Sequence, residues 1–420
     1  VDGGNDRVGI GAVPTAAKLE IHGGAYNTSL LIKGSGADTG IKFVDSAGNT
    51  DGYVYAAGGE VGFLDDDAEW MVNCVTDTRV ELRVANVKKF IVDANSRISL
   101  SNNDSGSYNT VFGKLAGAAL ASGGDGNLFI GENAGNDVTT ADYNIAIGYQ
   151  AFSQATDDCD KNIVIGVSAM SGNIGSNDVS ECVAIGHEAM DGVLTSDATG
   201  TIGIGYQALT ALTSGIGNTS VGYNALLTCT DGDYNTAFGY NTLKLMSGSG
   251  NIGNTALGFN ALQSCTSGSK NVGISVDALS GLTTGEGNIA IGYAAGGGMS
   301  TSETNKDSDH NTFIGVDVGG GNWADPVSEQ NVAIGNYALD GLLDGATGNV
   351  CVGYFAGSGV TSGDEGVFIG KEAGKGITIG LGNVAVGKNA MGGVTAGASG
   401  AFNYNVAVGH SALQGTSATN

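Results

Sequence analysis

The sequence contains very little proline, positive charge, or charge of any kind. Only 2 of its 420 residues are Pro, 17 are Lys or Arg, and charged residues make up 14%. The scarcity of proline and the absence of a Gly-X-Y period exclude collagen. The formal net charge of −25 excludes a general nucleic-acid binder, because such a protein neutralises phosphates with Lys and Arg.

Long apolar runs and closely spaced cysteines are also missing. No run of 18 apolar residues occurs, so we expect no insertion into a membrane. The chain begins at Val1 without a basic and apolar leader, which is typical of a processed product or a fragment. The cysteines lack metal-ligand spacing and are interpreted as mostly free, buried thiols, with a Cys159–Cys182 disulfide as the alternative: Cys74, Cys159, Cys182, Cys229, Cys265 and Cys351.

Glycine, by contrast, is abundant, with 74 residues, and 41% of the chain is hydrophobic. That hydrophobic content is enough for a core and argues against simple disorder. An ordinary helical enzyme is disfavoured, because each Gly inside a helix costs about 1 kcal/mol relative to Ala. We therefore expect the glycines to occupy regular positions in another architecture.

A repeated phrase supplies that regularity from Asn109 onward. It reads Asn, three mostly apolar residues, Gly, two variable residues, Ala, and then Leu, Met or Gly, and it recurs in about 17 copies. Cys182, Thr201 and Gly366 replace the leading Asn in three copies, and Ser275 replaces the Gly in one. A fixed period of this kind predicts a solenoid. Representative Asn and Gly positions are Asn127, Gly131, Asn144, Gly148, Asn235, Gly239, Asn288, Gly292, Asn331 and Gly335.

Each copy is interpreted as a short strand, a turn, and a second, shorter strand. Side chains alternate along a strand, so the first and third apolar residues share one face, which we expect to be buried. The middle residue is usually Ala, with Phe129, Phe313 and Phe368 as exceptions, and it faces a second wall or another chain. The Gly fits a corner with positive φ. The Asn side chains can hydrogen-bond to one another along the axis.

The coil is narrow, and much of its remaining surface is Gly, Ser and Thr. Such a surface does little to stabilise a monomer, and solenoid ends need capping. We therefore predict that several chains associate laterally through the Ala/Phe face, most simply as a homotrimer. With strands about 4.8 Å apart, about seventeen coils would form a rod of roughly 80 Å.

The phrase Asn-x-Ala-Ile-Gly-x-x-Ala-Leu resembles the head repeat of trimeric autotransporter (YadA-like) adhesins. Residues 235–243 and 254–262 resemble more closely the longer-period form found in phage tail-fibre proteins. The segment 7–21 is similar to a segment of phage tail fibres and related fibre domains. The resemblance implies trimers of left-handed parallel β-rolls.

The fold class predicted from these observations is all-β. A parallel β-solenoid of about 17 coils, left-handed as the resemblance implies, occupies residues 105–420, and a small antiparallel β module occupies residues 1–104. The module is interpreted as a shaft or cap. Its predicted strands are the alternating runs Ser29–Lys33, Ile41–Val44, Tyr53–Ala56, Glu69–Val75, Val80–Val84 and Phe90–Val92.

Two long insertions between coils, 296–310 and 319–330, are the main candidates for binding. Insertions in a solenoid tend to lie on one face, often the binding face. Trp323 in the second insertion, together with Asp325 and His310, is the predicted contact set for a glycan or a protein. The alternative is that Trp323 folds back over the roll as a lid.

A calcium loop is the candidate for a metal site. Asp307, Asp309 and Asn311 alternate as in the first half of such a loop, although Thr312 and Val318 stand where its Gly and Glu would be. A solvated acidic loop is the alternative interpretation. No catalytic arrangement of Ser, Cys or His is evident, and no other cofactor is expected.

The sequence predicts a non-enzymatic, elongated trimeric fibre protein of a virion, such as a phage tail fibre. Its predicted role is attachment to a glycan or protein on the host surface, in contact with other fibre or tail proteins. Its predicted location is therefore the virion or another extracellular position. A bacterial trimeric surface adhesin and a purely structural spacer are the alternatives.

Overall fold

The computed structural model describes 14 stretches of the chain in two compact units, residues 1–102 and 103–420. The division lies close to the predicted boundary at residue 104. Within the described ranges the only helical segment is the short 3-10 turn η1 (Ser196–Ala198), and no helix there is long and apolar enough to cross a membrane. The described residues are 38–44, 47, 49–57, 60–75, 79–84, 87–93, 98–100, 106–174, 177–247, 253–299, 308–321, 323, 327–394 and 402–415.

The first unit is one antiparallel sheet whose seven strands pair in chain order. The antiparallel module is therefore confirmed. Two of its strands were not predicted: β3, which Gly62 interrupts, and β7, which has only three residues. The predicted strand Ser29–Lys33 lies outside the described residues. The strands are β1 (Asp38–Val44), β2 (Thr50–Ala57), β3 (Glu60–Leu64), β4 (Trp70–Val75), β5 (Arg79–Val84), β6 (Val87–Asp93) and β7 (Ile98–Leu100).

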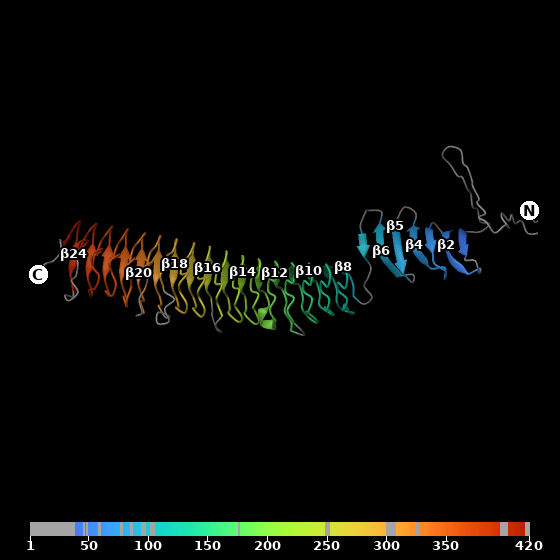
Figure 1. The fold of residues 1–420 in the computed structure, drawn as a ribbon, viewed down its shortest axis with the longest axis horizontal. Coiled ribbons are helices and arrows are strands. Elements are labelled where there is room, and N and C mark those ends of the chain that lie inside the picture. The colour runs from blue at the N-terminus through green and yellow to red at the C-terminus, as the bar shows by residue number, and fades with distance from the viewer. Residues whose placement is uncertain are drawn as a thin grey trace, which may run out of the picture. The chain divides into compact units, whose positions relative to one another are not determined.

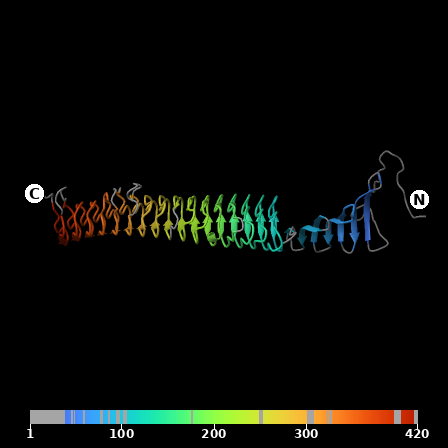
Figure 2. The ribbon, with the colours of Figure 1, turned by 90° about the horizontal axis from the view of Figure 1, so that it is seen from below.

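The second unit is a parallel β-solenoid, as predicted, and each coil contains one three-residue strand. Its 17 strands pair with their neighbours in chain order from β8 to β24, and Figures 1 and 2 show the coils stacked in this order. The strands are β8 (Thr110–Phe112), β9 (Leu128–Ile130), β10 (Ile145–Ile147), β11 (Ile163–Ile165), β12 (Val183–Ile185), β13 (Ile202–Ile204), β14 (Thr219–Val221), β15 (Thr236–Phe238), β16 (Thr255–Leu257), β17 (Val272–Ile274), β18 (Ile289–Ile291), β19 (Thr312–Ile314), β20 (Val332–Ile334), β21 (Val350–Val352), β22 (Val367–Ile369), β23 (Val384–Val386) and β24 (Val406–Val408).

The leading Asn residues form the predicted buried ladder. Oδ1 of Asn271 accepts from the backbone N–H of Asn288 at 2.9 Å and from its Nδ2 at 3.1 Å. Nδ2 of Asn271 donates to the carbonyl of Gly285 at 2.7 Å and to Oδ1 of Asn254 at 3.2 Å. Each Asn thus satisfies polar groups of two neighbouring coils, which buried groups require.

The copies led by Cys182 and Thr201 keep part of this hydrogen-bond pattern. The backbone N–H of Cys182 donates to Oδ1 of Asn162 at 2.9 Å, and its thiol donates to the carbonyl of Ala198 at 3.2 Å. The hydroxyl of Thr201 donates to the carbonyl of Gly215 at 3.4 Å. In both coils the accepting carbonyl lies three residues before the leading residue of the next coil. An Asn side-chain amide donates to the equivalent carbonyl in other coils, as Asn271 does to Gly285.

The Gly that follows every strand except β17 forms a corner with positive φ, as predicted. Gly131 has a φ of 131°, and Gly148 has one of 137°. A Cβ placed on Gly131 would lie 2.5 Å from the carbonyl oxygen of Gly148 in the next coil. Gly is therefore required both by conformation and by the close approach of the next backbone.

The predicted second strand is wrong. After the corner, Gln150 and Phe152 both have φ values of 55°, so the chain curls instead of extending. The segment is still tied to its neighbour, because the N–H of Phe152 donates to the carbonyl of Ala169 at 3.0 Å. Ala151 and Phe152 are fully buried, so the predicted second wall is present in a turn conformation.

The predicted orientation of the strand residues is also wrong. The middle residue of each strand lies inside its own coil, as Ala146 and Phe313 do with no exposed surface. The first and third residues, such as Ile145 and Ile147, point outward and are half-exposed. The interior is so narrow that one small side chain and one larger side chain from the opposite wall fill it, which leaves no room for two β-branched residues.

Candidate interaction surfaces

The solenoid has an uncovered apolar surface along its strands, the outer strand face, which consists of the first and third residues of β8 to β24. Every third residue is apolar, every first residue is apolar or Thr, and none is charged. Phe238, Leu257 and Ile291 are exposed members of this face. With a spacing of about 4.8 Å between strands, the face extends for about 80 Å.

Such a face is unusual for a sheet in water. Parallel sheets are normally covered on both faces, and continuous apolar patches of this kind mark protein interfaces. The Ala/Phe face was predicted to serve as the interface, but its residues are already buried within the coil. Any lateral contact between chains through the sheet would therefore use the outer strand face.

The sheet of the first unit also has an uncovered apolar face. Ile41, Val54, Phe63, Val72 and Leu82 pair across β1 to β5 in one row, so their side chains share a face. Ile41, Phe63 and Leu82 are exposed, and the other two are half-exposed. The two units thus share the property of presenting an apolar strand face.

Trp323 was predicted as an exposed binding residue, and the structure places it in the core. Its side chain is 4% exposed, and its ring meets Phe313 edge-on with the centroids 5.8 Å apart. Its indole N–H donates to the carbonyl of Gly319 at 3.0 Å. The alternative interpretation, in which Trp323 folds back over the roll, therefore describes its position.

The other two residues of the predicted contact set do not join Trp323. Asp325 lies outside the described residues. His310 is exposed and has a φ of 58°. Its ring lies beside Gly287 of the preceding coil, where a Cβ would be 3.1 Å from Cδ2 of His310. His310 is thus a surface residue, whereas Trp323 belongs to the interior.

The predicted calcium ligands serve other purposes where they are described. Asp307 lies outside the described residues, and Oδ1 of Asp309 accepts from the backbone N–H of Glu286 at 2.6 Å. Oδ1 of Asn311 accepts two hydrogen bonds from Asn331, at 3.0 and 3.1 Å, so both of its lone pairs are occupied. Asn311 is therefore a ladder residue and not a cation ligand. Across the described part of the chain, no cluster of three His, Cys, Asp or Glu side chains could hold a metal ion.

The thiols of the solenoid have environments that suppress reactivity. Burial raises the pKa of Cys182 and Cys229 to about 11 and that of Cys265 to about 12. The pKa of Cys351 is raised as well, again by burial. Because the thiolate is the nucleophile, these groups are inert packing residues. The structure records all six cysteines as free, as predicted, although Cys74 is only half-buried.

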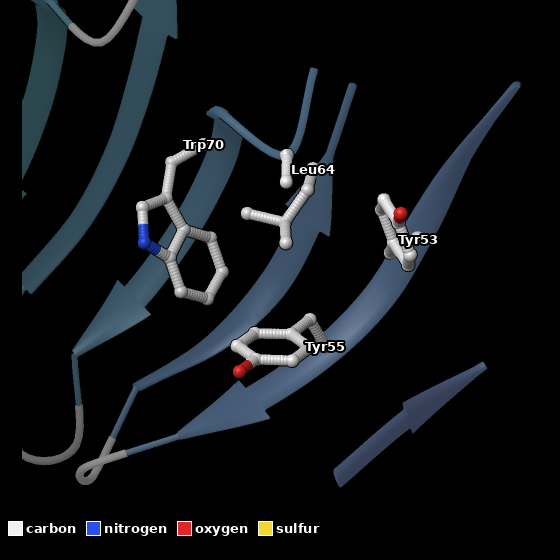
Figure 3. A pocket seen from close by; sticks show the side chains of 5 residues that line it. Tyr53, Tyr55, Leu64 and Trp70 are labelled. Atoms are coloured by element: carbon white, nitrogen blue, oxygen red, sulfur yellow. The ribbon is translucent and has the colours of Figure 1, made fainter. Parts of the chain in front are cut away.

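A small aromatic pocket on the first unit was not predicted from the sequence. It has a volume of about 310 Å³ and is lined by Tyr53, Tyr55, Leu64, Ala68 and Trp70. Figure 3 shows four of these side chains around one space. The rings of Tyr55 and Trp70 meet edge-on with centroids 6.1 Å apart. The alternation Tyr-Val-Tyr in β2 is the sequence signal that could have indicated an aromatic face.

Charged groups lie near two of the residues that line this pocket, Tyr53 and Ala68. The ammonium group of Lys42 lies 5.8 Å from the ring centroid of Tyr53. Ala68 belongs to an acidic turn in which Oδ1 of Asp65 accepts from the N–H of Glu69 at 2.8 Å. The pocket therefore offers apolar ring surface, and charged groups lie near two of its lining residues, an arrangement suited to small amphipathic groups.

Comparisons of the chain with models of protein families, with curated proteins and with solved structures find no match.

Proposed function

We propose that the protein is an elongated, homotrimeric fibre protein of a virion that contributes to attachment to a host-cell surface. The observation that carries the assembly is the outer strand face, apolar and uncharged over 17 strands. Leu257, for example, is 44% exposed. A second chain that covers such residues removes apolar surface from water and thereby stabilises the assembly. The fibre role rests on the solenoid fold together with the resemblance of the repeat to phage tail fibres.

Attachment would follow from repetition. A trimeric rod presents three copies of each surface loop, and a virion carries several such rods, so weak individual contacts combine into strong overall binding. The net charge of −25 per chain favours solubility and disfavours binding to bare anionic surfaces. A neutral glycan or a protein is therefore the expected receptor class.

The assembly is tested by light scattering on the purified chain. A homotrimer has three times the chain mass of 41.7 kDa. Leu257→Lys places a charge on the outer strand face, and we expect it to reduce the mass to that of one chain. Leu245→Lys is the matched control, because Leu245 is equally exposed at 43% but lies outside the strands. A wild-type monomer, or equal effects of both variants, would contradict the proposed interface.

The attachment role is tested separately, with the intact trimer labelled and incubated with panels of bacterial cells. Saturable binding to particular strains supports attachment. A trimer that binds none of them while remaining part of purified virions would identify a structural spacer instead. Trimers recovered from the bacterial surface and absent from virions would indicate the adhesin alternative.

A further inference from the structure

A stacked column of aromatic rings runs along the solenoid beside the outer strand face. We call it the aromatic ladder and define it as His187, Tyr206, Tyr223, Tyr240 and Phe259, each of which directly follows a corner Gly. Successive ring centroids are 5.4, 4.8, 5.0 and 5.3 Å apart. The two Tyr–Tyr pairs are nearly parallel, with interplanar angles of 10° and 6°.

The fold holds the three tyrosines of the aromatic ladder in register. Tyr206, Tyr223 and Tyr240 occupy the same position in consecutive coils, and the corner glycines before them have nearly identical φ values of 137° to 142°. The parallel strands before them pair without a register shift. The rings are 40 to 45% exposed, so small oxidants in solution can reach them.

We propose that Tyr206, Tyr223 and Tyr240 form an oxidative cross-linking site, at which neighbouring coils become joined by a dityrosine bond. The co-reactant is a one-electron oxidant of the peroxidase and hydrogen peroxide class. Each of two tyrosines gives up one electron to the oxidant and its phenolic proton to solvent, which leaves two phenoxyl radicals. One peroxide molecule takes up both electrons and two protons and becomes two water molecules.

The two radicals then couple through the ring carbons next to their oxygens, forming one carbon–carbon bond. The hydrogen on each of these carbons moves to the phenolic oxygen as the rings regain aromaticity. The product has lost two hydrogen atoms overall. The rings must tilt toward each other to form the bond, and rotation about the exposed side chains provides this motion.

The ends of the ladder confine the reaction to its centre. Phe259 has no phenol and His187 has an imidazole, and both are harder to oxidise than tyrosine. A radical formed on Tyr223 therefore has two partners at stacking distance, Tyr206 and Tyr240, and no better donor beyond them.

The chain contains matched tyrosines that lack such partners. Tyr149 and Tyr293 occupy the same position after a corner Gly and are exposed to a similar degree. The equivalent residues in the coils on either side of Tyr293 are Val276 and Val316, so no phenol stacks on it. The two isolated tyrosines and the three tyrosines of the aromatic ladder are thus similarly exposed, and they differ in whether another tyrosine stacks on them.

The experiment treats the full chain with a peroxidase and hydrogen peroxide and measures dityrosine fluorescence and mass. Tyr337 and Tyr354 also meet, with centroids 5.9 Å apart, so all proteins carry Tyr337→Phe to remove that source. Tyr223→Phe keeps a stacked ring but separates Tyr206 from Tyr240. We expect Tyr223→Phe to reduce the dityrosine signal to background and Tyr293→Phe to leave it unchanged.

Cleavage before aspartates, followed by fragmentation of the linked peptides, locates the bond. Tyr206 and Tyr223 fall in the fragment 197–230, and Tyr240 falls together with Tyr234 in the fragment 233–276. A link within the first fragment, or between the two fragments, is the expected result. The mobility of a single chain in a denaturing gel should persist, since the bond is intramolecular. Full dityrosine yield in Tyr223→Phe, bonds mapped to other tyrosines, or bonds formed mainly between chains would each overturn the proposal.

Discussion

The ring of Phe129 occupies the space that a side chain at Gly135 would need. A Cβ placed on Gly135 would lie 2.7 Å from Cε2 and Cζ of Phe129. The same pairing of a large strand residue with an opposing Gly recurs in the other two coils whose strand has Phe in the middle. Gly319 lies opposite Phe313, and Gly374 lies opposite Phe368. Most coils with Ala in the middle of the strand have Leu, Met or Phe at the opposing position.

Because the side chains at positions 129 and 135 share one space, we predict that the effects of substitutions at the two positions on stability are strongly coupled. Phe129→Ala should destabilise the solenoid by about 3 to 5 kcal/mol, because it leaves a cavity in a fully buried site. Gly135→Leu should also destabilise, by about 1 to 3 kcal/mol, through overpacking against the ring. The double variant should recover most of the loss, since it reproduces the pairing of other coils. Chemical denaturation measures all four proteins.

The backbone at position 135 makes the recovery possible. Gly135 has a φ of 58°, and Leu209, at the equivalent position of another coil, has one of 56°. A Leu at 135 therefore adopts a conformation that the fold already accommodates. If the losses of the two single variants simply add in the double variant, volume exchange does not explain the pattern.

The hydrogen bonds of the Asn ladder predict how much stability is lost when Asn271 is replaced. Asn271→Ala should cost about 2 to 4 kcal/mol, because Gly285 loses a donor and two donors of Asn288 lose their acceptor. Asn271→Thr should cost less, since Thr201 shows that a hydroxyl can donate to the equivalent carbonyl. Denaturation midpoints compare the two. Equal losses would indicate that the donated bond has little importance.

The period of the repeat made the stacked strands, the Asn ladder and the corner glycines predictable. A residue that recurs once per coil lies above its own copy in the next coil, so Asn271 must meet Asn254 and Asn288. Corner residues such as Gly131 follow from the same logic, because only Gly fits where the next backbone approaches this closely.

The inner and outer faces could not be assigned in this way. Both Ile145 and Ala146 are apolar and alternate along the strand, and the pattern does not show which one faces the interior. The volume available inside a coil decides it, and this volume depends on the opposing residue, as Phe129 and Gly135 demonstrate. Trp323 lies in an insertion without periodicity, so its burial had no sequence signal. The pocket at Tyr55 and Trp70 depends on strand pairing that was only partly predicted.

Asp340 makes the stability of the solenoid depend on pH. Burial, and secondarily the negative charge of Asp317, raises its pKa from 3.8 to about 6. The folded state therefore binds the proton more tightly than the unfolded state does. The resulting stabilisation is fully present below about pH 3.8 and is lost as the pH rises through about 6.

We therefore predict that Asp340→Asn is more stable than the wild type at pH 7.5, by on the order of 1 kcal/mol after allowance for solvent screening at a half-exposed site. The difference should shrink toward zero near pH 4. Asp317→Asn should have a weaker effect of the same sign, because it removes the secondary cause. Thermal unfolding across this pH range is the measurement, and a difference independent of pH would assign the effect to packing.

Ser275 is the one residue other than Gly at a corner position in the 17 copies, and its φ is 112°. Side chains rarely adopt this conformation, and residues held in such regions carry about 1 to 3 kcal/mol of strain. Ser275→Gly should therefore stabilise the protein, by about 1 kcal/mol once the greater freedom of Gly in the unfolded chain is included.

Gly292→Ser is the matched reverse change one coil later. It should destabilise strongly, because Gly292 has a φ of 137° and its Cβ would overlap the carbonyl oxygen of Gly315. Denaturation midpoints that shift in opposite directions for the two variants are the expected result. A loss of stability in Ser275→Gly would mean that the hydroxymethyl group contributes more than the strained backbone costs.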